Sequence, residues 1–181
     1  MKTKNIENYL KSFGQQVVND AKANLSIAKG STALGQSIRF EVVPDSQGFT
    51  TKFYMDNYGE YLDKGVSGNK KEVSFEDYKG KIRSSPYRYT TKGAPIDILS
   101  KWIKRKGIKP KGLGRGRSKD TGQYISGFAY LISRKIKREG IKSLSFFQKP
   151  LGIEYELLKE NFLKELKLDI ETYITTFYRP K

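Results

Sequence analysis

The stretch Gly127–Leu166, GFAYLISRKIKREGIKSLSFFQKPLGIEYELLKENFLKEL, contains two helical patterns joined by an aromatic corner. The apolar residues of the first pattern recur at helical spacing and predict one buried face: Phe128, Leu131, Ile132 and Ile136. Gly140 ends this helix, because glycine adopts the left-handed cap conformation without steric cost. Phe146, Phe147 and Pro150 predict a compact corner before the second helix. Nothing in the stretch is typical of an active site, so we interpret it as a scaffold that presents surfaces to a partner.

The segments at the start of the chain predict a long helix and a β-hairpin. Apolar residues step by three or four over residues 5–28, which predicts an amphipathic helix that ends at Gly30. A polar link at 31–35 follows. Two alternating segments, 37–43 and 49–55, flank a turn and predict a β-hairpin.

Several aromatic residues lie at and after the end of this hairpin. Phe53 and Tyr54 are neighbours on a strand and point to opposite faces, so they do not form one platform for stacking bases. Residues 57–65 predict a short helical turn. We therefore interpret these aromatics as core packing plus a subunit contact, with Tyr58 and Tyr61 as candidate contact residues.

The middle of the chain is less regular, and we predict an insertion at 66–119 within a single domain of 1–181. Residues 66–93 predict a long loop with at most an irregular strand pair, and 95–106 predict a short helix. A flexible basic loop is expected from Gly107 onward, because four glycines and a proline disfavour a helix there.

The predicted core consists of 1–65 and 120–181. Its second half contains a helix from about residue 121 to 139 and a last helix at about 153–177. The expected apolar stripe of the last helix is Leu158, Phe162, Leu166, Ile170, Tyr173 and Phe177.

The charge of the chain indicates a polyanionic neighbour. The sequence has 35 Lys and Arg residues against 19 Asp and Glu, a net charge of +16. Such an excess favours contact with nucleic acid or with an acidic protein surface. In the basic loop, cations on a glycine-rich backbone suit sequence-independent contact with phosphates. The candidate DNA-facing residues are Lys109, Lys111, Arg115, Arg117 and Lys119.

Composition excludes several kinds of chemistry. The chain has no Cys and no His, which excludes disulfides, thiolate sites, the usual zinc ligands and the Ser-His-Asp triad. The GLGRGR segment at 112–117 lacks the Gly-Lys-Ser/Thr ending of a phosphate-binding loop. We therefore predict no catalytic residue, no cofactor and no metal site, and we expect a protein that is not an enzyme.

A carboxylate-dependent nuclease remains an alternative. Two acidic groups are candidates for binding a cation, although neither has the spacing of a calcium loop. The first comprises Glu72, Glu76 and Asp77, and the second comprises Asp56, Glu60 and Asp63.

No apolar run approaches the roughly 18 residues of a membrane span. The N-terminal segment is polar and periodic, unlike a signal peptide. We expect a protein that resides in, or is assembled from, a cytoplasm.

Three segments carry motifs that invite comparison with a known family. They are STALGQSIRFEV at 31–42, YGEYLDKGVSG at 58–68 and FAYLISRKIKREGIKSLSFFQKPL at 128–151. The first is similar to a threonine-glycine-x-leucine-x-x-serine-isoleucine pattern, from which Ala33-Leu34-Gly35 depart. The second is similar to tyrosine-x-x-tyrosine-x-glutamate-phenylalanine-glycine. The third resembles isoleucine-arginine-lysine-isoleucine, glycine, phenylalanine, x-x-proline/alanine-leucine.

These patterns occur in the tail-completion family of tailed bacteriophages, also described as neck or head-to-tail joining proteins, and the chain resembles that family. The resemblance implies an α+β fold in which a small antiparallel sheet is packed by long N- and C-terminal helices. It also implies a non-enzymatic structural subunit of the virion, assembled in the host cytoplasm. Several copies would form a ring in the neck or tail that joins head to tail around the DNA channel.

The resemblance further implies partners for this chain. They are other copies in a homo-oligomeric ring, and the neighbouring portal, adaptor or tail proteins. Non-specific contact with packaged double-stranded DNA is also expected. No contact with a membrane is expected. The basic face of the helix near 121–139 presents Arg134, Lys135, Lys137 and Arg138, which meet either an acidic neighbour in the ring or the genome in the channel. We favour the acidic neighbour, because the glycine-rich loop before this helix is the better candidate for DNA. The alternative is a free, sequence-independent nucleic-acid-binding protein that uses the basic loop at 101–119.

Overall fold

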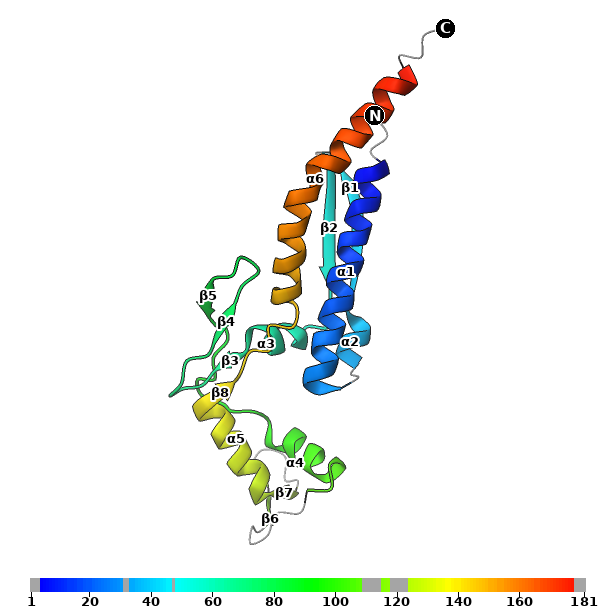
Figure 1. The fold of residues 1–181 in the computed structure, drawn as a ribbon. Coiled ribbons are helices and arrows are strands. Elements are labelled where there is room, and N and C mark those ends of the chain that lie inside the picture. The colour runs from blue at the N-terminus through cyan, green and yellow to red at the C-terminus, as the bar shows by residue number, and fades with distance from the viewer. Residues whose placement is uncertain (1–3, 31–32, 47, 109–114, 118–123, 178–181) are drawn as a thin grey trace. The chain divides into compact units, whose positions relative to one another are not determined.

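The computed structural model describes residues 4–30, 33–46, 48–108, 115–117 and 124–177 (Figure 1). The predicted α+β fold is confirmed: long N- and C-terminal helices pack together, and the strands form small antiparallel two-stranded sheets. The chain divides into two compact units. Unit 1 comprises Met1–Asp63, Glu76–Arg83 and Leu144–Lys181, and unit 2 comprises Lys64–Phe75 and Ser84–Ser143.

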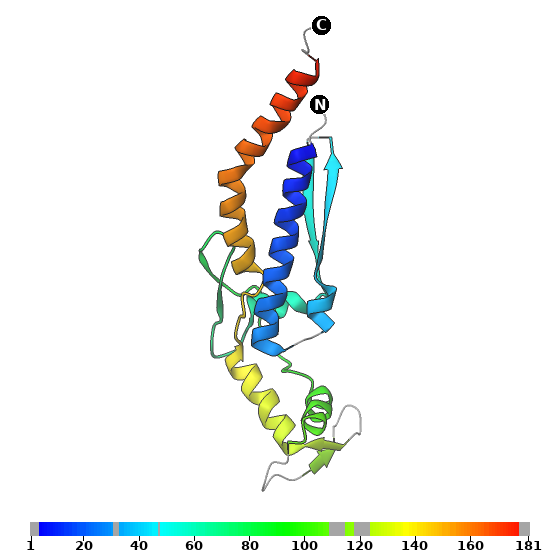
Figure 2. The same cartoon turned by 45° about the vertical axis from the view of Figure 1, so that its right-hand side comes forward.

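Unit 1 is built on two long helices and a hairpin. Its main elements are α1 (Lys4–Lys29), α2 (Ala33–Ser37), β1 (Arg39–Asp45), β2 (Gly48–Tyr54), α3 (Tyr58–Lys64) and α6 (Gln148–Phe177). Figures 1 and 2 show α1 and α6 running side by side in opposite directions, with the β1–β2 hairpin along α1. β4 (Ser74–Glu76) and β5 (Ile82–Ser84) form a further two-stranded sheet, to which unit 1 contributes Glu76, Ile82 and Arg83.

The stripe predicted for the first helix is buried. It comprises Ile6, Leu10, Phe13, Val17, Ala21 and Leu25. Gly30 ends α1 with a φ of 75°, as predicted. The link at 31–35 differs from the prediction, because residues 33–37 form α2 and bury Leu34 completely. The sequence does not predict this helix, because one buried leucine in five residues gives no periodic apolar pattern.

The hairpin packs its apolar face on α1, as its alternation predicted. β1 pairs antiparallel with β2, and the paired strands extend into the predicted turn, since Pro44 and Asp45 belong to β1 and pair with Phe49 and Gly48. The partly buried ring of Phe53 packs against the core, with its centroid 6.1 Å from that of Phe13 and 5.4 Å from that of Phe147. Edge-to-face ring pairs of this kind contribute about 0.5–1.5 kcal/mol beyond the area they bury.

The aromatic corner enters the same core. Phe146 is 1% exposed and Phe147 is 7% exposed, so the predicted corner is confirmed. Pro150 is not part of it, because α6 begins at Gln148 rather than near residue 153. Proline fits there, since the N–H groups of a helix's first turn have no intrahelical partner.

Two buried aspartates cap the two long helices. The carboxylate of Asp169, 2% exposed, accepts hydrogen bonds from the backbone N–H groups of Asn5 and Ile6, both at 3.0 Å. Asp63, also 2% exposed, accepts from the N–H of Phe147 at 2.8 Å. Each carboxylate thus supplies acceptors to the positive end of a helix, where the first N–H groups are otherwise unpaired.

The stripe predicted for the last helix is only partly buried. Leu158, Phe162 and Leu166 are half-buried, and Leu158 packs against the core, whereas Ile170 and Tyr173 are 41% and 42% exposed. The prediction for these two residues was wrong, because α6 turns the carboxylate of Asp169 toward α1 at this level.

Among its described residues, unit 2 contains two helices and two small sheets. Its elements are β3 (Val66–Ser67), α4 (Ile96–Arg105), β6 (Arg115–Arg117), β7 (Tyr124–Ser126), α5 (Gly127–Glu139) and β8 (Gly140–Ile141). The helix predicted at 95–106 is confirmed as α4. The helix predicted from about residue 121 begins only at Gly127, because residues 124–126 form β7 and pair with β6.

The face that α5 buries is narrower than predicted. Ala129 and Ser133 are buried, and the Ser133 hydroxyl donates to the Ala94 carbonyl at 2.6 Å. Leu131 is 47% exposed, so its prediction as a core residue was wrong. α5 packs on α4 and β7 within unit 2, where small residues permit a close approach. In the part of the chain that the structure describes, no helix is long and apolar enough to cross a bilayer.

The buried cap on α1 gives a stability prediction. Asp169→Ala leaves the N–H groups of Asn5 and Ile6 without their acceptor, so we expect the free energy of unfolding to fall by about 2 kcal/mol. Urea unfolding followed by far-ultraviolet circular dichroism measures this loss. Glu171→Ala, two residues along α6 and exposed, should change stability by less than about 0.5 kcal/mol. Equal effects of the two substitutions would contradict the capping role.

Candidate nucleic-acid interface

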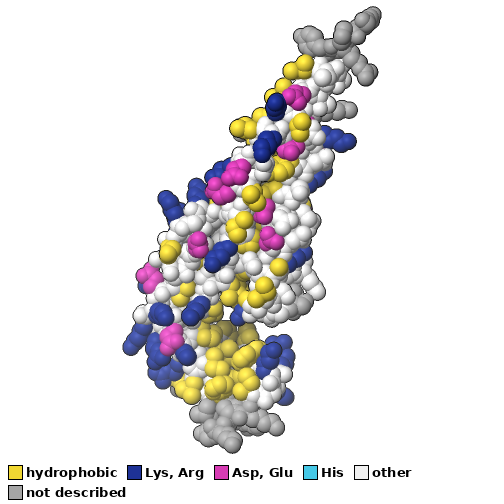
Figure 3. All heavy atoms as spheres, in the orientation of Figure 1, with side chains coloured by type: hydrophobic (Ala, Val, Ile, Leu, Met, Phe, Trp, Pro, Cys, Tyr) yellow, Lys and Arg dark blue, Asp and Glu magenta, His cyan; other side chains and the backbone are white. Residues whose placement is uncertain are grey.

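The charge of the chain is divided unequally between the two units. Unit 2 contains 19 Lys and Arg residues against four Asp and Glu, and unit 1 contains 16 against 15, which together make the 35 and 19 of the chain. Unit 2 therefore carries a formal charge of +15 and unit 1 a charge of +1. Figure 3 shows acidic and basic side chains interspersed along α6 and basic side chains gathered beside α5. The excess positive charge of the chain thus lies almost entirely in unit 2.

The C-terminal end of α5 is capped by a turn from far away in the sequence. The backbone N–H of Asn69 donates to the Lys137 carbonyl at 2.8 Å, and the N–H of Lys70 donates to the Arg138 carbonyl at 3.1 Å. A Cβ on Gly68 would lie 2.2 Å from the Arg138 oxygen, so only glycine permits this approach. Gly140 ends α5 with a φ of 80°, as predicted, and starts β8, which pairs with β3.

This junction forms a hollow of about 540 Å³ with a strongly basic lining. We call it the basic hollow. Its described lining residues are Asn69, Lys70, Leu131, Arg134, Lys135, Lys137 and Arg138. It brings together the four basic residues of α5 that were predicted as partner contacts and adds Lys70 from the turn. No local sequence signal indicates that addition, because Lys70 and Arg138 lie far apart along the chain.

One carboxylate offsets part of this charge. Glu139 forms ion pairs with Arg138 at 2.6 Å and with Lys135 at 4.0 Å. The hydrogen bond from Arg138 holds the pKa of Glu139 below its usual value, with further help from the charge of Lys135. Glu139 is therefore ionised near neutral pH.

The remaining cations of the hollow have only neutral protein partners in the described contacts. The Lys137 ammonium donates to the Thr91 carbonyl at 2.7 Å. The Arg134 guanidinium lies 5.8 Å from the Tyr130 ring centroid, which leaves its charge uncompensated. One Glu139 charge against five cations leaves the hollow positive.

The predicted basic loop is only partly within the described residues. Lys109, Lys111 and Lys119 lie outside them. The backbone of Arg115 and Arg117 forms β6, paired with Ser126 and Tyr124, so this segment is a strand rather than the flexible loop predicted. In the neighbouring α4 the side chains of Lys101, Lys104 and Arg105 are exposed.

The predicted aromatic contacts lie in unit 1. Tyr58 and Tyr61, on α3, are 45% and 46% exposed. Phe53 and Tyr54 point to opposite faces, as predicted: Phe53 enters the core, and the Tyr54 ring lies 4.3 Å beneath the Arg39 guanidinium. Phe53 and Tyr54 thus form no common stacking platform, and the contact role of Tyr58 and Tyr61 stays a prediction.

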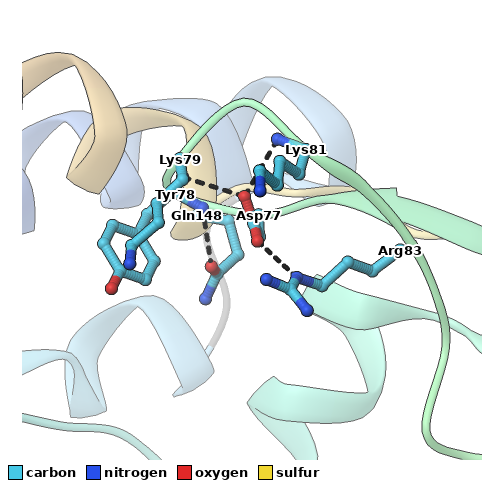
Figure 4. A network of polar contacts seen from close by, with 6 residues as sticks. All are labelled: Asp77, Tyr78, Lys79, Lys81, Arg83 and Gln148. Carbon is cyan, nitrogen blue, oxygen red and sulfur yellow. Dashed lines mark hydrogen bonds and ion pairs between the residues drawn. The ribbon is translucent and has the colours of Figure 1, made fainter.

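The carboxylate of Asp77 serves a turn (Figure 4). It accepts hydrogen bonds from the backbone N–H groups of Lys79 at 2.9 Å and Lys81 at 3.0 Å, and from the Arg83 guanidinium. Beside it, the N–H of Tyr78 donates to the Gln148 side chain at 3.1 Å, which fixes the turn to the start of α6. The oxygens of Asp77 are thus occupied by protein donors.

In the second acidic group predicted for a cation, Asp63 likewise has a structural role, because it caps α6. Among the described residues, no group of three or more Asp and Glu side chains has an arrangement that could hold a metal ion. Both buried aspartates in the predicted groups have structural partners, which leaves the nuclease alternative without a supporting geometry in the described parts of the chain.

The Asp77 turn gives a pH prediction. The Arg83 hydrogen bond, aided by the N–H groups of Lys81 and Lys79, lowers the pKa of Asp77. A carboxyl with a lowered folded pKa stabilises the fold above its unfolded pKa of about 3.9, and this contribution disappears as the pH falls through the folded value. Asp77→Asn should therefore accelerate hydrogen exchange in the β4–β5 turn near neutral pH, and the difference from wild type should shrink below about pH 4.

Glu76→Gln is the control for this experiment, because the Glu76 side chain is 47% exposed and lies 3.9 Å from the Lys149 ammonium. It should leave exchange in the turn nearly unchanged at every pH. A difference between wild type and Asp77→Asn that persists undiminished in acid would contradict the assigned role of the charge.

Comparisons of the chain with protein-family models, with curated proteins and with solved structures find no match. The resemblance of residues 31–42, 58–68 and 128–151 to the tail-completion family therefore stays a prediction that rests on those motifs.

Proposed function

We propose that this chain is a structural protein that contacts nucleic acid through unit 2, without catalysing a reaction on it. The observation that carries the proposal is the division of charge, +15 in unit 2 against +1 in unit 1. A surface that only aids solubility needs no such separation. Double-stranded DNA carries one negative charge per about 1.7 Å of its axis, and cations that neutralise its phosphates gain affinity by releasing counterions.

In the form that the resemblance implies, the protein is one subunit of an oligomeric ring in a phage neck or tail. Unit 1 then supplies contacts between copies, and unit 2 faces DNA or a neighbouring virion protein. An exposed apolar stripe on α6 supports the first assignment. Leu163, Ile170 and Ile174 are 69%, 41% and 49% exposed and lie on one side of the helix, apart from its buried face. Apolar stripes of this kind often mark protein interfaces.

A second candidate is a free protein that binds nucleic acid independently of sequence. The same charge division supports it, and it requires no assembly. The two candidates differ in oligomeric state, because only a ring subunit needs a surface on unit 1 that pairs with another copy.

The assembly proposal predicts an effect of charge on the α6 stripe. Leu163→Glu combined with Ile174→Glu should dissociate the oligomer without unfolding the chain, because both side chains are already exposed. Light scattering coupled to size exclusion measures the mass. Ile27→Glu is the matched control: Ile27 is 86% exposed on α1, and its substitution should leave the oligomer intact. A wild-type protein that is monomeric at high concentration yet binds duplex DNA at sub-micromolar Kd would refute the ring and leave the second candidate.

Substitutions in β6 separate assembly from DNA contact. Arg115→Ala with Arg117→Ala should leave the oligomeric mass unchanged and weaken only a salt-sensitive contact with DNA. Fluorescence anisotropy with a labelled duplex should show a log Kd against log salt slope reduced by up to about two. Loss of folding, seen by circular dichroism, would instead show that the two arginines are structural.

A further inference from the structure

We infer that the basic hollow binds backbone phosphates of nucleic acid, an inference that rests on the proposed function. It assigns Arg134, Lys135, Lys137 and Arg138 to the nucleic acid rather than to an acidic neighbour in a ring. It also adds Lys70, which reaches the same place from the Gly68–Lys71 turn.

The hollow is built before any ligand arrives. Two backbone hydrogen bonds fix the Gly68–Lys71 turn to the end of α5, and a third, from the Gly68 N–H to the Lys71 carbonyl at 2.8 Å, closes the turn itself. The absent side chain at Gly68 allows its backbone to press against the Arg138 carbonyl. Cations held on such a scaffold lose less conformational entropy on binding than those on a mobile segment.

The cations of the hollow are not needed to complete α5. Basic residues at a helix C-terminus ordinarily serve its unpaired carbonyls. In α5, backbone N–H groups of Asn69 and Lys70 already bond the carbonyls of Lys137 and Arg138. The charges of Lys70 and Arg134 therefore stay available for an anion.

The lining of the hollow fits nucleic acid better than a protein. Protein interfaces have an apolar centre, whereas Leu131 is the one apolar side chain among its described lining residues. The positive charge also extends beyond the hollow to the exposed Lys101, Lys104 and Arg105 of α4 in the same unit. A repeating polyanion matches such an extended field, and lysine and arginine contacts to phosphate carry no base sequence.

The test compares two double variants of the full chain that each remove two positive charges. Lys70→Gln with Arg134→Gln alters the hollow. Lys29→Gln with Lys52→Gln removes two exposed lysines of unit 1 and is the matched control. The probe is a labelled DNA duplex at about 50 to 200 mM salt, with circular dichroism to confirm folding. We expect the hollow variant to bind about tenfold or more weakly than wild type, whatever the duplex sequence. The slope of log Kd against log salt concentration should fall by about two. The control variant should change little in both quantities.

The outcomes separate the inference from the proposed function. If wild type binds the duplex tightly and the hollow variant binds as well as wild type, the inference is wrong and the proposed function stands. Equal losses in both variants show an effect of net charge alone and overturn the inference. Displacement of the duplex by poly-glutamate at equal charge concentration points to an acidic protein and also overturns it. If wild type does not bind the duplex at all, the proposed function itself fails.

Discussion

Two buried carboxylates connect distant elements of unit 1 by capping its two long helices. Asp169 accepts hydrogen bonds from backbone N–H groups at the start of α1, and Asp63 accepts one from the N–H of Phe147 at the start of α6. Burying a carboxylate costs free energy unless hydrogen-bond donors pair with it. The first N–H groups of a helix lack intrahelical acceptors. The hydrogen bonds between the two therefore offset both costs. Each cap also links elements distant in sequence. Edge-to-face contacts of the Phe53 ring with Phe13 and Phe147 connect the hairpin to α1 and to the start of α6.

The charge division suggests different tasks for the two units. Unit 1 is nearly neutral and has a large core together with exposed apolar residues on α6, which suits contacts with proteins. Unit 2 buries less apolar surface among its described residues, and its close helix packing relies on Ala129 and Ser133. Its basic residues are displayed on α4, α5 and the Gly68–Lys71 turn. A protein that bridges a nucleic acid and a protein assembly would need both kinds of surface.

Periodicity predicted the parts of this fold that local sequence determines. The stripe of α1, the hairpin, α4 and the glycine stop at Gly140 follow from spacing and from backbone conformations that favour glycine. Parts that depend on distant partners were missed. Asp169 lies within an apolar stripe and gave no sign that it caps a helix, because its partners are at the other end of the chain. The sequence predicts helix at residues 124–126, where the structure has β7, because β7 forms only by pairing with β6 and local spacing does not indicate that pairing.

The candidate site shows the same limit. The basic residues of α5 were recognised from their clustering, but Lys70 joins them only through the fold. The most direct test of nucleic-acid contact through unit 2 is hydrogen exchange of the full chain, followed by mass spectrometry, with and without a saturating DNA duplex. Slowed exchange in the Gly68–Lys71 turn and the end of α5, with α1 and the β1–β2 hairpin unchanged, is the predicted result. Protection confined to unit 1, or an identical exchange pattern with and without the duplex, would contradict it.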